Sequence, residues 1–318
     1  MTGRVGRAIG ALVALGVAAS VAVGVVRSGP GATARAQPAV VTVAAAHRSS
    51  YVPVAAGSRP LYILVLGSDA RPGQNLIRQR SDSIHLIGLD KTRTRATILG
   101  FPRDSYVSIP GHGHGKINSA MVLGGPALVV ETIEQLTGIT IDLWVLTWFE
   151  GLDQAVDAIG GLDVTVPYRM DDSASHAHFA PGPQHLVGWQ ALAFARDRHD
   201  APNGDFSRSF NQGSILKAAL TQLREQFAND PTRLLTWIIA GWRNVRTSLT
   251  FDDMLDLAMT ATQMNPKSVR NLVLTGSGGF VGSTSVVYLS GASQAAFADL
   301  RDDGYVKGNA GVQTSSVP

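Results

Sequence analysis

The sequence predicts an α/β fold for the chain beyond residue 58. Three observations lead to this prediction: apolar runs typical of strands recur from residue 61, segments with helical spacing alternate with them, and Gly- and Pro-containing turns separate the two. Alternating strands and helices are typical of helices layered on a sheet. With 45% hydrophobic residues among 318, the chain has enough apolar side chains for a substantial core.

The sheet is predicted to begin with three strands. The segments LYILVLG, SIHLIGLD and TRATILGF are rich in branched and apolar side chains, and turn residues bound each of them. They are residues 61–67, 83–90 and 94–101.

Helix and strand patterns alternate through the middle of the chain. A helix is predicted at 124–138, with Gly138 as its C-terminal cap, and another at 149–161, which ends in Gly-Gly. Strands are predicted before and after the second helix, at 140–148 and 162–167.

The remaining segments are mainly of helical type. A short helix at 188–197 precedes a long one at 205–227, for which Asp205 and Ser207 are N-cap candidates. The other predicted elements are helices at 231–242 and 251–263, a strand at 269–274 and a helix at 294–302.

The first 58 residues are predicted to attach the domain to a membrane. Residues 8–26 form an uncharged apolar run that follows two arginines and has the length of a transmembrane helix, about 20 residues. We therefore predict that 1–27 form a short cytoplasmic N-terminus and signal-anchor, and that 28–58 form a linker outside the cytoplasm. A signal peptide cleaved near ATARAQPA is the alternative. No second linker follows, so 59–306 is predicted as one domain at the cell envelope and 307–318 as a loose tail.

Composition argues against several classes of function. The chain has no cysteine, which excludes disulfides and cysteine-based metal sites. Its net charge of +3 comes from 27 basic and 24 acidic residues, a small surplus that does not imply nucleic acid as a partner. Neither a P-loop, nor GxGxxG after a strand, nor a GxSxG elbow occurs, so nucleotide hydrolysis and serine acyl transfer are not predicted.

Two aspartates at strand ends are candidate metal ligands. Asp69 follows the first predicted strand and Asp82 precedes the second, so the two side chains converge if these strands are neighbours. Carboxylate oxygens suit Mg²⁺, with Mn²⁺ as a second possibility. The alternative is structural, with Asp69 capping a turn and Asp82 pairing with Arg80.

Basic residues after the third predicted strand are candidate phosphate ligands. The guanidinium of Arg103 can contact two phosphate oxygens at once, and Lys116 can add a point charge. A salt bridge from Arg103 to Asp104 or Asp82 is the structural alternative.

Residues 195–212, ARDRHDAPNGDFSRSFNQ, concentrate charge in a chain that is only 16% charged. Arg208 and Gln212 are spaced i, i+4 and share one helical face, while Arg196 and Arg198 precede the helix. Helix N-termini also attract anions. The segment therefore predicts an anion site, with a solvated loop of mixed charge as the alternative.

Seven blocks of the sequence, in their order, are similar to the LytR-CpsA-Psr family, the exported enzymes that attach glycopolymers to bacterial peptidoglycan. The resemblance is strong over residues 60–220. The blocks are LGSDAR, RSDSIHLIGLD, FPRDSYVSIPG, KINSAMVLGGP, FEGLDQAVDAIGGLDVTVP, GPQHLVGWQALAFARDRH and GDFSRSFNQ.

The resemblance implies a three-layer α/β/α fold with a central mixed sheet and an apolar pocket for a polyprenyl chain. It implies that the donor is a glycan linked to polyprenyl pyrophosphate and that the acceptor is peptidoglycan. A peptidoglycan sugar hydroxyl would attack the phosphorus next to the glycan, and polyprenyl phosphate would leave. A hydrolase that uses water as the acceptor, and a membrane-anchored protein that only binds the prenyl pyrophosphate, remain the alternatives.

The resemblance also implies residue roles. Asp69 and Asp82 would hold Mg²⁺, and Asp205 is the first candidate for a general base, with Asp104 second. Family members often carry a further Arg where this chain has Phe210 and Asn211, so packing or acceptor contacts are expected to differ there. The implied pyrophosphate ligands are Arg80, Arg103, Lys116, Arg196, Arg198, Arg208 and Gln212, and the implied catalytic residues are Arg103, Arg196, Arg198, Arg208 and Asp205.

Overall fold

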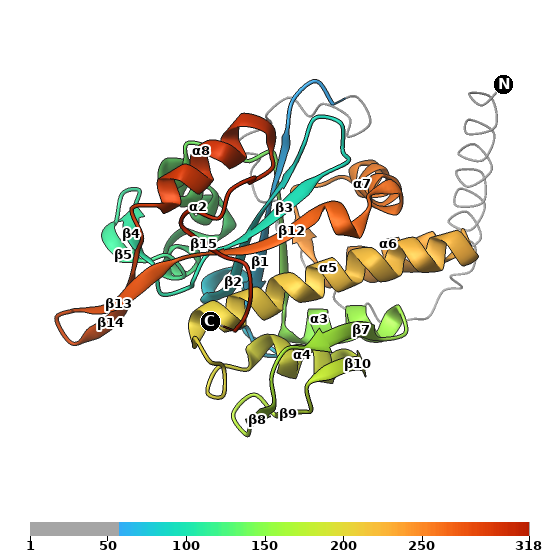
Figure 1. Ribbon diagram of the computed structural model, residues 1–318, viewed down its shortest axis with the longest axis horizontal. Coiled ribbons are helices and arrows are strands. Elements are labelled where there is room, and N and C mark those ends of the chain that lie inside the picture. Colours follow the sequence, from blue (N-terminus) through green and yellow to red (C-terminus); the bar gives the residue numbers. More distant parts are fainter. Residues whose placement is uncertain (1–56, 318) are drawn as a thin grey trace, which may run out of the picture. The chain divides into compact units, whose positions relative to one another are not determined.

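The computed structural model describes residues 57–317 (Figure 1). The predicted signal-anchor at 1–27 lies outside the described residues, as does nearly all of the predicted linker at 28–58. Within 57–317, no helix combines the length and apolar character needed to cross a bilayer.

A seven-stranded mixed sheet forms the centre of the described domain. The three strands predicted first, at residues 61–68, 81–89 and 96–100, pair antiparallel in chain order. A parallel partner lies on each side of this group, at residues 143–148 and 269–274. The predicted α/β fold with a central mixed sheet is therefore confirmed. In pairing order, the strands are β11 (Arg246–Thr247), β6 (Leu143–Trp148), β1 (Leu61–Ser68), β2 (Ser81–Leu89), β3 (Ala96–Gly100), β12 (Val269–Leu274) and β15 (Val312–Gln313).

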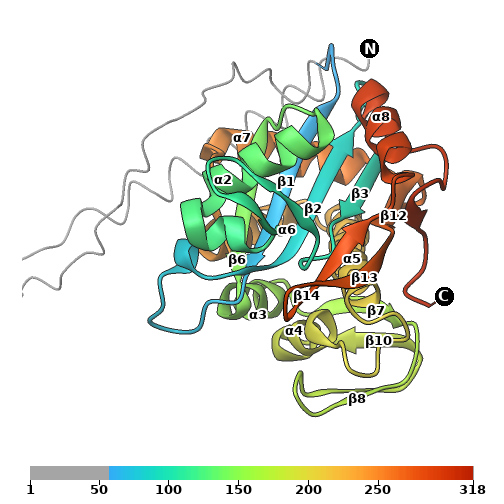
Figure 2. The ribbon, with the colours of Figure 1, turned by 90° about the vertical axis from the view of Figure 1, so that its left-hand side faces the viewer.

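Helices cover both faces of this sheet, which gives the three layers (Figures 1 and 2). α2 (Ser119–Thr137) and α8 (Ser293–Asp303) pack on one face, and α5 (Asp205–Asn229) and α7 (Phe251–Gln263) pack on the other. α6 (Arg233–Asn244) lies beside α5 and α7.

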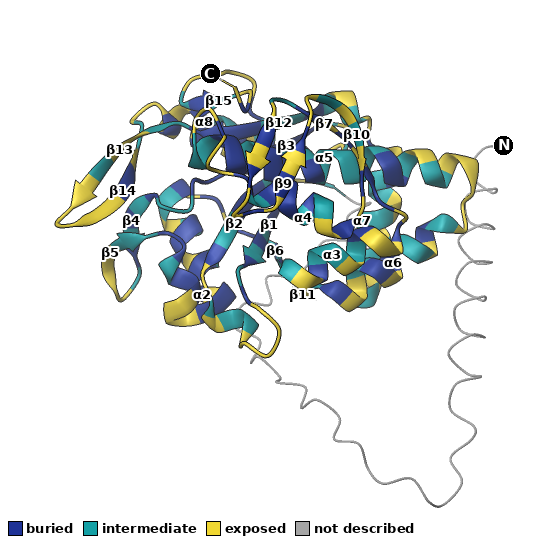
Figure 3. Cartoon of the chain, turned by 90° about the horizontal axis from the view of Figure 1, so that it is seen from below, coloured by how far each residue is buried: buried dark blue, intermediate teal, exposed yellow. Residues whose placement is uncertain are grey.

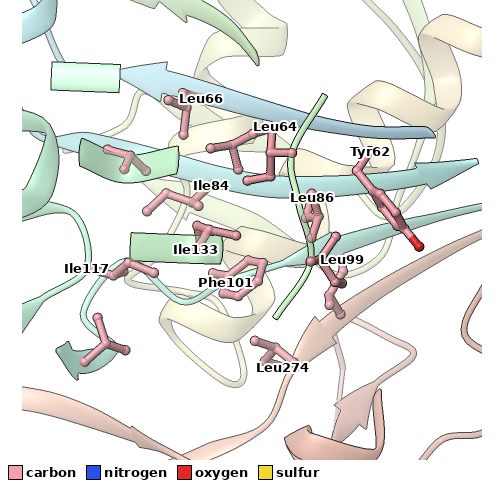
Figure 4. Close-up of a cluster of buried hydrophobic side chains, with 14 of the residues drawn as sticks. Tyr62, Leu64, Leu66, Ile84, Leu86, Leu99, Phe101, Ile117, Ile133 and Leu274 are labelled. Atoms are coloured by element: carbon pink, nitrogen blue, oxygen red, sulfur yellow. The ribbon is translucent and has the colours of Figure 1, made fainter. Parts of the chain in front are cut away.

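The alternation of side chains along β1 explains why both faces are covered. Leu64 and Leu66 belong to the buried cluster that includes Ile133 of α2 (Figure 4). Ile63 points to the other face, into the cluster in which Leu216 of α5 packs. Successive strand residues face opposite sides, so an apolar run buries two surfaces at once.

Two glycines allow α5 to lie unusually close to the sheet. A Cβ atom at Gly100 of β3 would collide with Ser209 Oγ of α5. A Cβ atom at Gly213 of α5 would collide with Asn271 Oδ1 of β12. A larger residue at either position would push the helix away from the strands.

A smaller layer of short elements lies beside α5 and has its own apolar core (Figure 2). The sequence predicted the strand at β7 and the helix at α4, but not the three short strands between them. The layer contains α3 (Phe149–Ala158), β7 (Leu162–Val166), β8 (Met170–Asp172), β9 (Ala177–Phe179), β10 (Gly182–Leu186) and α4 (Gly188–Arg196).

Two hairpins were also missed by the sequence prediction, and α2 begins earlier than the predicted residue 124. The backbone of Gly125 has a φ of 69°, which kinks α2 and joins an initial helical turn to the predicted helix. The hairpins are β4 (Tyr106–Ile109) with β5 (Gly113–Lys116), and β13 (Gly276–Val281) with β14 (Thr284–Leu289).

The prediction of a loose tail at 307–318 is wrong for the segment around β15. Val312 and Gln313 pair with β12, and the Val312 side chain is buried. The Ser207 hydroxyl of α5 donates a hydrogen bond to the carbonyl of Ser316, which is also buried. Two residues are too short a pattern for a strand to be predicted from sequence. This segment is ordered because it pairs with β12 at the edge of the sheet.

We predict that Val312→Ala lowers the free energy of unfolding by about 1.5 kcal/mol, at roughly 0.8 kcal/mol per buried CH₂ equivalent. Val317→Ala is the matched control, because that valine lies in the same tail but is 39% exposed. Urea unfolding of the two variants measures both effects. Equal, negligible effects would mean that the tail does not pack on the sheet.

Candidate functional site

A cavity of about 250 Å³ opens between the end of β1, the N-terminal part of α5 and the layer that holds α3 and α4. One part of its wall is apolar and the other is charged. The apolar part includes Val65, Trp148, Phe149, Leu152, Ile215 and Leu216. The charged part includes Asp82, Arg103, Asp172, Arg196, Arg198 and Arg208.

Four arginines against two aspartates give the charged wall a surplus of positive charge. Arg208 is buried, and burial, together with the nearby charges of Arg103 and Arg198, lowers its pKa to about 9. The guanidinium still carries its proton at neutral pH. A bound anion would offset the repulsion among these cations.

Two aspartates hold the central arginines in place. The Arg103 guanidinium donates through Nη1 to Asp82 Oδ1 at 2.6 Å, and its backbone N–H donates to Asp205 Oδ2 at 3.0 Å. The other oxygen of Asp205 accepts from Arg208 Nη2. Asp205 lies in the first turn of α5, where the helix dipole favours a carboxylate. Both oxygens of Asp205 are therefore engaged.

Gln212 links three elements at the cavity wall. Its Nε2 donates to the carbonyl of Asp82 in β2 at 3.3 Å and to that of Ala195 in α4 at 3.1 Å. These two bonds account for both N–H groups of the side-chain amide.

A buried network fastens the segment that carries Arg196 and Arg198. Asp197, which lies between them, is fully buried and accepts a hydrogen bond from the Tyr168 hydroxyl at 2.9 Å. Burial, followed by neighbouring acidic charge, raises the pKa of Asp197. Asn211 of α5 donates to the same hydroxyl at 3.0 Å and so joins the helix to this network. Sequence reasoning gave Asp197 no role.

Arg196 and Arg198 differ in their surroundings. The Arg196 guanidinium lies 4.7 Å from the ring centroid of Phe149, a cation–π contact that places it over an apolar wall residue. Arg198 is exposed at the cavity.

The two candidate metal ligands lie together, as the pairing of β1 and β2 requires. Burial and the charge of Asp82 raise the pKa of Asp69, and Asp69 Oδ1 is buried without a hydrogen-bond partner. An unpartnered carboxylate oxygen beside a second carboxylate suits a divalent cation. In the part of the chain that the structure describes, no group of three or more acidic or histidine side chains is arranged for metal binding.

Two predicted phosphate ligands are not among the cavity-lining residues. The Arg80 residue is exposed, and its backbone carbonyl accepts a hydrogen bond from the Asp69 N–H. Lys116 Nζ lies 3.0 Å from Asp104 Oδ1 and forms an ion pair with it. The structure therefore brings together Asp82, Arg103, Arg196, Arg198, Arg208 and Gln212 in the wall, with Asp205 and Asp69 directly beside them.

Sequence reasoning missed a contact between a histidine and a carboxylate at the wall. His199 Nδ1 lies 3.0 Å from both carboxylate oxygens of Asp172, which is in β8. Burial alone would raise the pKa of Asp172, but hydrogen bonds from Ala174 N–H, His199 and Ser175 hold it below its usual range. Only the charged motif RDRHD signalled His199, and nothing in the sequence paired it with β8.

His85 connects β2 to α5 inside the core. It is fully buried, with Nε2 donating to the Ser209 carbonyl at 3.0 Å and Nδ1 3.1 Å from Ser83 Oγ. Burial lowers its pKa to about 4, although the carbonyl contact opposes the shift. The ring is therefore neutral and holds α5 one residue from Arg208.

We predict that this histidine makes the fold sensitive to acid. The unfolded chain takes up a proton near the ordinary histidine pKa of about 6.5, whereas folded His85 takes one up only near pH 4. The stabilisation is complete above about pH 6.5, and about 3 kcal/mol is lost as the pH falls to about 4, at ~1.4 kcal/mol per pKa unit. Urea unfolding across this range should show a shallower pH dependence for His85→Asn than for the native chain. An NMR-measured pKa of His85 near 6.5 would contradict the prediction.

Comparison with known proteins shows which family the chain resembles. The model of the LytR_cpsA_psr family matches residues 33–301. The chain is 37% identical over 201 residues to the polyisoprenyl-teichoic acid–peptidoglycan teichoic acid transferase TagU of Bacillus mycoides (strain KBAB4), covering 63% of this chain and 64% of that one. It is 32% identical over 240 residues to TagV of Bacillus subtilis (strain 168), covering 72% of this chain and 60% of that one. The chain thus spans slightly under two thirds of the length of these relatives.

Solved structures share the fold. The crystal structure of B. subtilis TagV matches with a TM-score of 0.63 and 30% identity over 77% of this chain and 95% of that one. TagT bound to LIIa-WTA matches with a TM-score of 0.63 and 25% identity over 80% of this chain and 92% of that one. On the extent of the family match, this chain belongs to the LytR_cpsA_psr family.

Proposed function

We propose that this protein transfers a glycopolymer from a polyprenyl-pyrophosphate carrier to a sugar hydroxyl of peptidoglycan. The observation that carries the proposal is the cavity, in which four arginines adjoin an apolar wall. A polyprenyl pyrophosphate has the same two parts, an anion next to an apolar chain. The names of the relatives TagU and TagV, both teichoic acid transferases that use a polyisoprenyl donor and peptidoglycan, support the same reaction class.

The proposed reaction forms one phosphodiester bond and breaks one bond of the pyrophosphate. The acceptor hydroxyl attacks the phosphorus that carries the glycan, and its proton leaves to solvent or to a carboxylate of the site. The bond from that phosphorus to the bridging oxygen breaks, and polyprenyl phosphate departs. Negative charge collects on the bridging and non-bridging oxygens as this happens.

In this proposal the arginines stabilise that charge. Arg208 and Arg103 approach from α5 and from the loop after β3. Asp205 orients the Arg208 guanidinium, and Asp82 orients that of Arg103. Arg196 and Arg198 approach from the end of α4. Cations fixed before the reaction stabilise the transition state more than the ground state, because no reorganisation is needed when the charge develops.

Asp205 and Gln212 are better suited to positioning than to direct contact with the substrate. Both Asp205 oxygens and both Gln212 N–H groups are used in holding Arg103, Arg208 and the ends of β2 and α4. Asp104, the second candidate base, is paired with Lys116. Asp205 therefore has a partner on each oxygen, whereas Asp104 is paired through Oδ1 alone.

We also propose that Asp69 and Asp82 hold Mg²⁺. The unpartnered Asp69 Oδ1 and the charge of the neighbouring Asp82 support this assignment. A bound divalent cation would neutralise part of the pyrophosphate charge. The proposed location is the cell membrane, with residues 1–27 as the anchor and the domain outside the cytoplasm, where peptidoglycan lies.

Analysis of the products tests the reaction. The full chain in detergent micelles is incubated with Mg²⁺, a polyprenyl-pyrophosphate glycan and peptidoglycan oligomers, and the products are identified by mass spectrometry. We expect glycan joined to peptidoglycan through a phosphodiester. Free glycan phosphate without an adduct would indicate a hydrolase, and intact donor would indicate a protein that only binds it; either result would overturn the proposal.

In the same assay, Arg208→Ala should lower the rate by about 10²–10³-fold, the usual effect of removing one preorganised group that stabilises developing charge. Arg224→Ala is the control, because Arg224 is on the same helix about four turns further along and donates to the Met264 carbonyl near α7. Circular dichroism checks that both variants are folded. A folded Arg208→Ala variant with native activity would remove Arg208 from the site.

Metal binding has a test that does not use activity. Millimolar Mg²⁺ should raise the melting temperature of the native chain by a few degrees, because a ligand that binds only the folded state stabilises it. Asp69→Asn should abolish this increase. The exposed Asp163, which lies in β7, provides the control Asp163→Asn. If Asp69→Asn keeps the full increase, these carboxylates do not hold the ion.

A further inference from the structure

The outer face of α6 carries an apolar stripe that the proposed reaction does not use. Leu235 and Ile239 are each 39% exposed, and Trp242 is 43% exposed. Their i, i+4, i+7 spacing places them on one side of the helix. Leu234 and Ile238 fill the buried side, in a cluster with α5 and α7. Figure 3 shows this alternation of buried and exposed positions along α6.

The stripe contains no charge, and the charges at its two ends nearly balance. Residues 234–242 include no Asp, Glu, Lys or Arg. Arg233 and Arg243 flank this run, with Asp230 before the helix and the acidic first turn of α7 beyond it. An occupant of this face must therefore be apolar itself, because neither end favours a strongly charged partner. The indole of Trp242 suits a boundary between apolar and aqueous phases.

The C-terminal end of α6 adjoins the cavity wall. The Thr147 hydroxyl donates to the carbonyl of Asn244, the last residue of α6, at 3.0 Å. The guanidinium of Arg246 lies 5.5 Å from the ring centroid of Trp148. Thr147 and Trp148 both line the cavity, so the C-terminal end of α6, two residues beyond Trp242, lies against the cavity wall.

We propose that α6 is the surface through which the domain rests on a lipid bilayer, with Leu235, Ile239 and Trp242 in the interfacial layer. A helix with one exposed apolar face and an aromatic residue is suited to lie in that layer. The position beside the cavity would let an apolar chain pass from the bilayer into the protein over a short distance. That last consequence rests on the proposed function, whereas the contact with the bilayer does not.

The tip of the β13–β14 hairpin is the competing surface. Phe280 is 71% exposed, and α6 and this hairpin lie at opposite ends of the described domain in both Figure 1 and Figure 3. The hairpin is joined to the segment after Arg103, since Val287 N–H donates to the Asp104 carbonyl, and its residues are not among those that line the cavity. α6 likewise contributes no residue to the cavity lining, and it is preferred because its three exposed apolar side chains share one face of a helix.

The absence of cysteine allows a direct test on the full chain. Single variants Leu235→Cys and Ile239→Cys carry an environment-sensitive fluorophore, and each protein is reconstituted into phosphatidylcholine vesicles that contain a spin-labelled lipid as quencher. Val122→Cys is the matched control, because Val122 of α2 has the same 39% exposure as Ile239. Phe280→Cys reports on the competing hairpin.

We expect quenching at positions 235 and 239 to exceed that at 122 by roughly twofold or more, and to persist without anionic lipid because the apolar face drives the contact. Equal quenching at 239 and 122 would overturn the proposal, as would quenching confined to 280 or dependent on anionic lipid. The readout requires neither donor nor acceptor. Its failure is therefore distinguishable from failure of the proposed transferase reaction, which only product analysis detects.

Discussion

The site depends on the close contact between the N-terminal end of α5 and strands β2 and β3. Gly100 leaves the space for this contact, and His85 fixes it with a hydrogen bond to the Ser209 carbonyl. The same end of the helix presents Asp205 to the backbone of Arg103 and carries Arg208. Interior packing is dense, so a shift of the helix would separate these two arginines. The geometry of the anion site is therefore set by apolar and neutral contacts behind it.

Those contacts hold charges in an arrangement that is unfavourable by itself. Burial and like charge lower the pKa of Arg208, and burial and like charge raise that of Asp69. Both shifts disfavour the charged form of the group. Acidic and basic groups with perturbed pKa values are typical of functional sites. A bound ligand of opposite charge can offset the repulsion among such groups. Here an anion would balance the arginines and a cation would balance the aspartates, as a metal-bound pyrophosphate does.

The sequence predicted the parts of this structure whose pattern is local. Strands with long apolar runs, such as β1 and β2, and the placement of Asp82 and Arg103 at strand ends could be read directly. The two-residue β15 could not, because its order comes from pairing with β12. For the same reason, the burial of Asp197 and its bond to Tyr168 depend on a tertiary fold that no spacing encodes. Motif matches identified side chains of the site. They could not show which polar atoms of those side chains are already hydrogen-bonded within the protein, as those of Asp205 are.

The size of the cavity bears on how a polyprenyl donor would be held. Pockets that enclose drug-sized molecules have volumes of about 300–1,000 Å³, and this cavity measures about 250 Å³. A polyprenyl donor longer than this cavity would leave part of its chain outside the protein in this conformation. The rest would stay in an apolar phase outside, and that phase must lie within reach of the cavity wall. The proposed bilayer contact on α6, whose C-terminal end meets the cavity wall at Thr147, would supply such a phase.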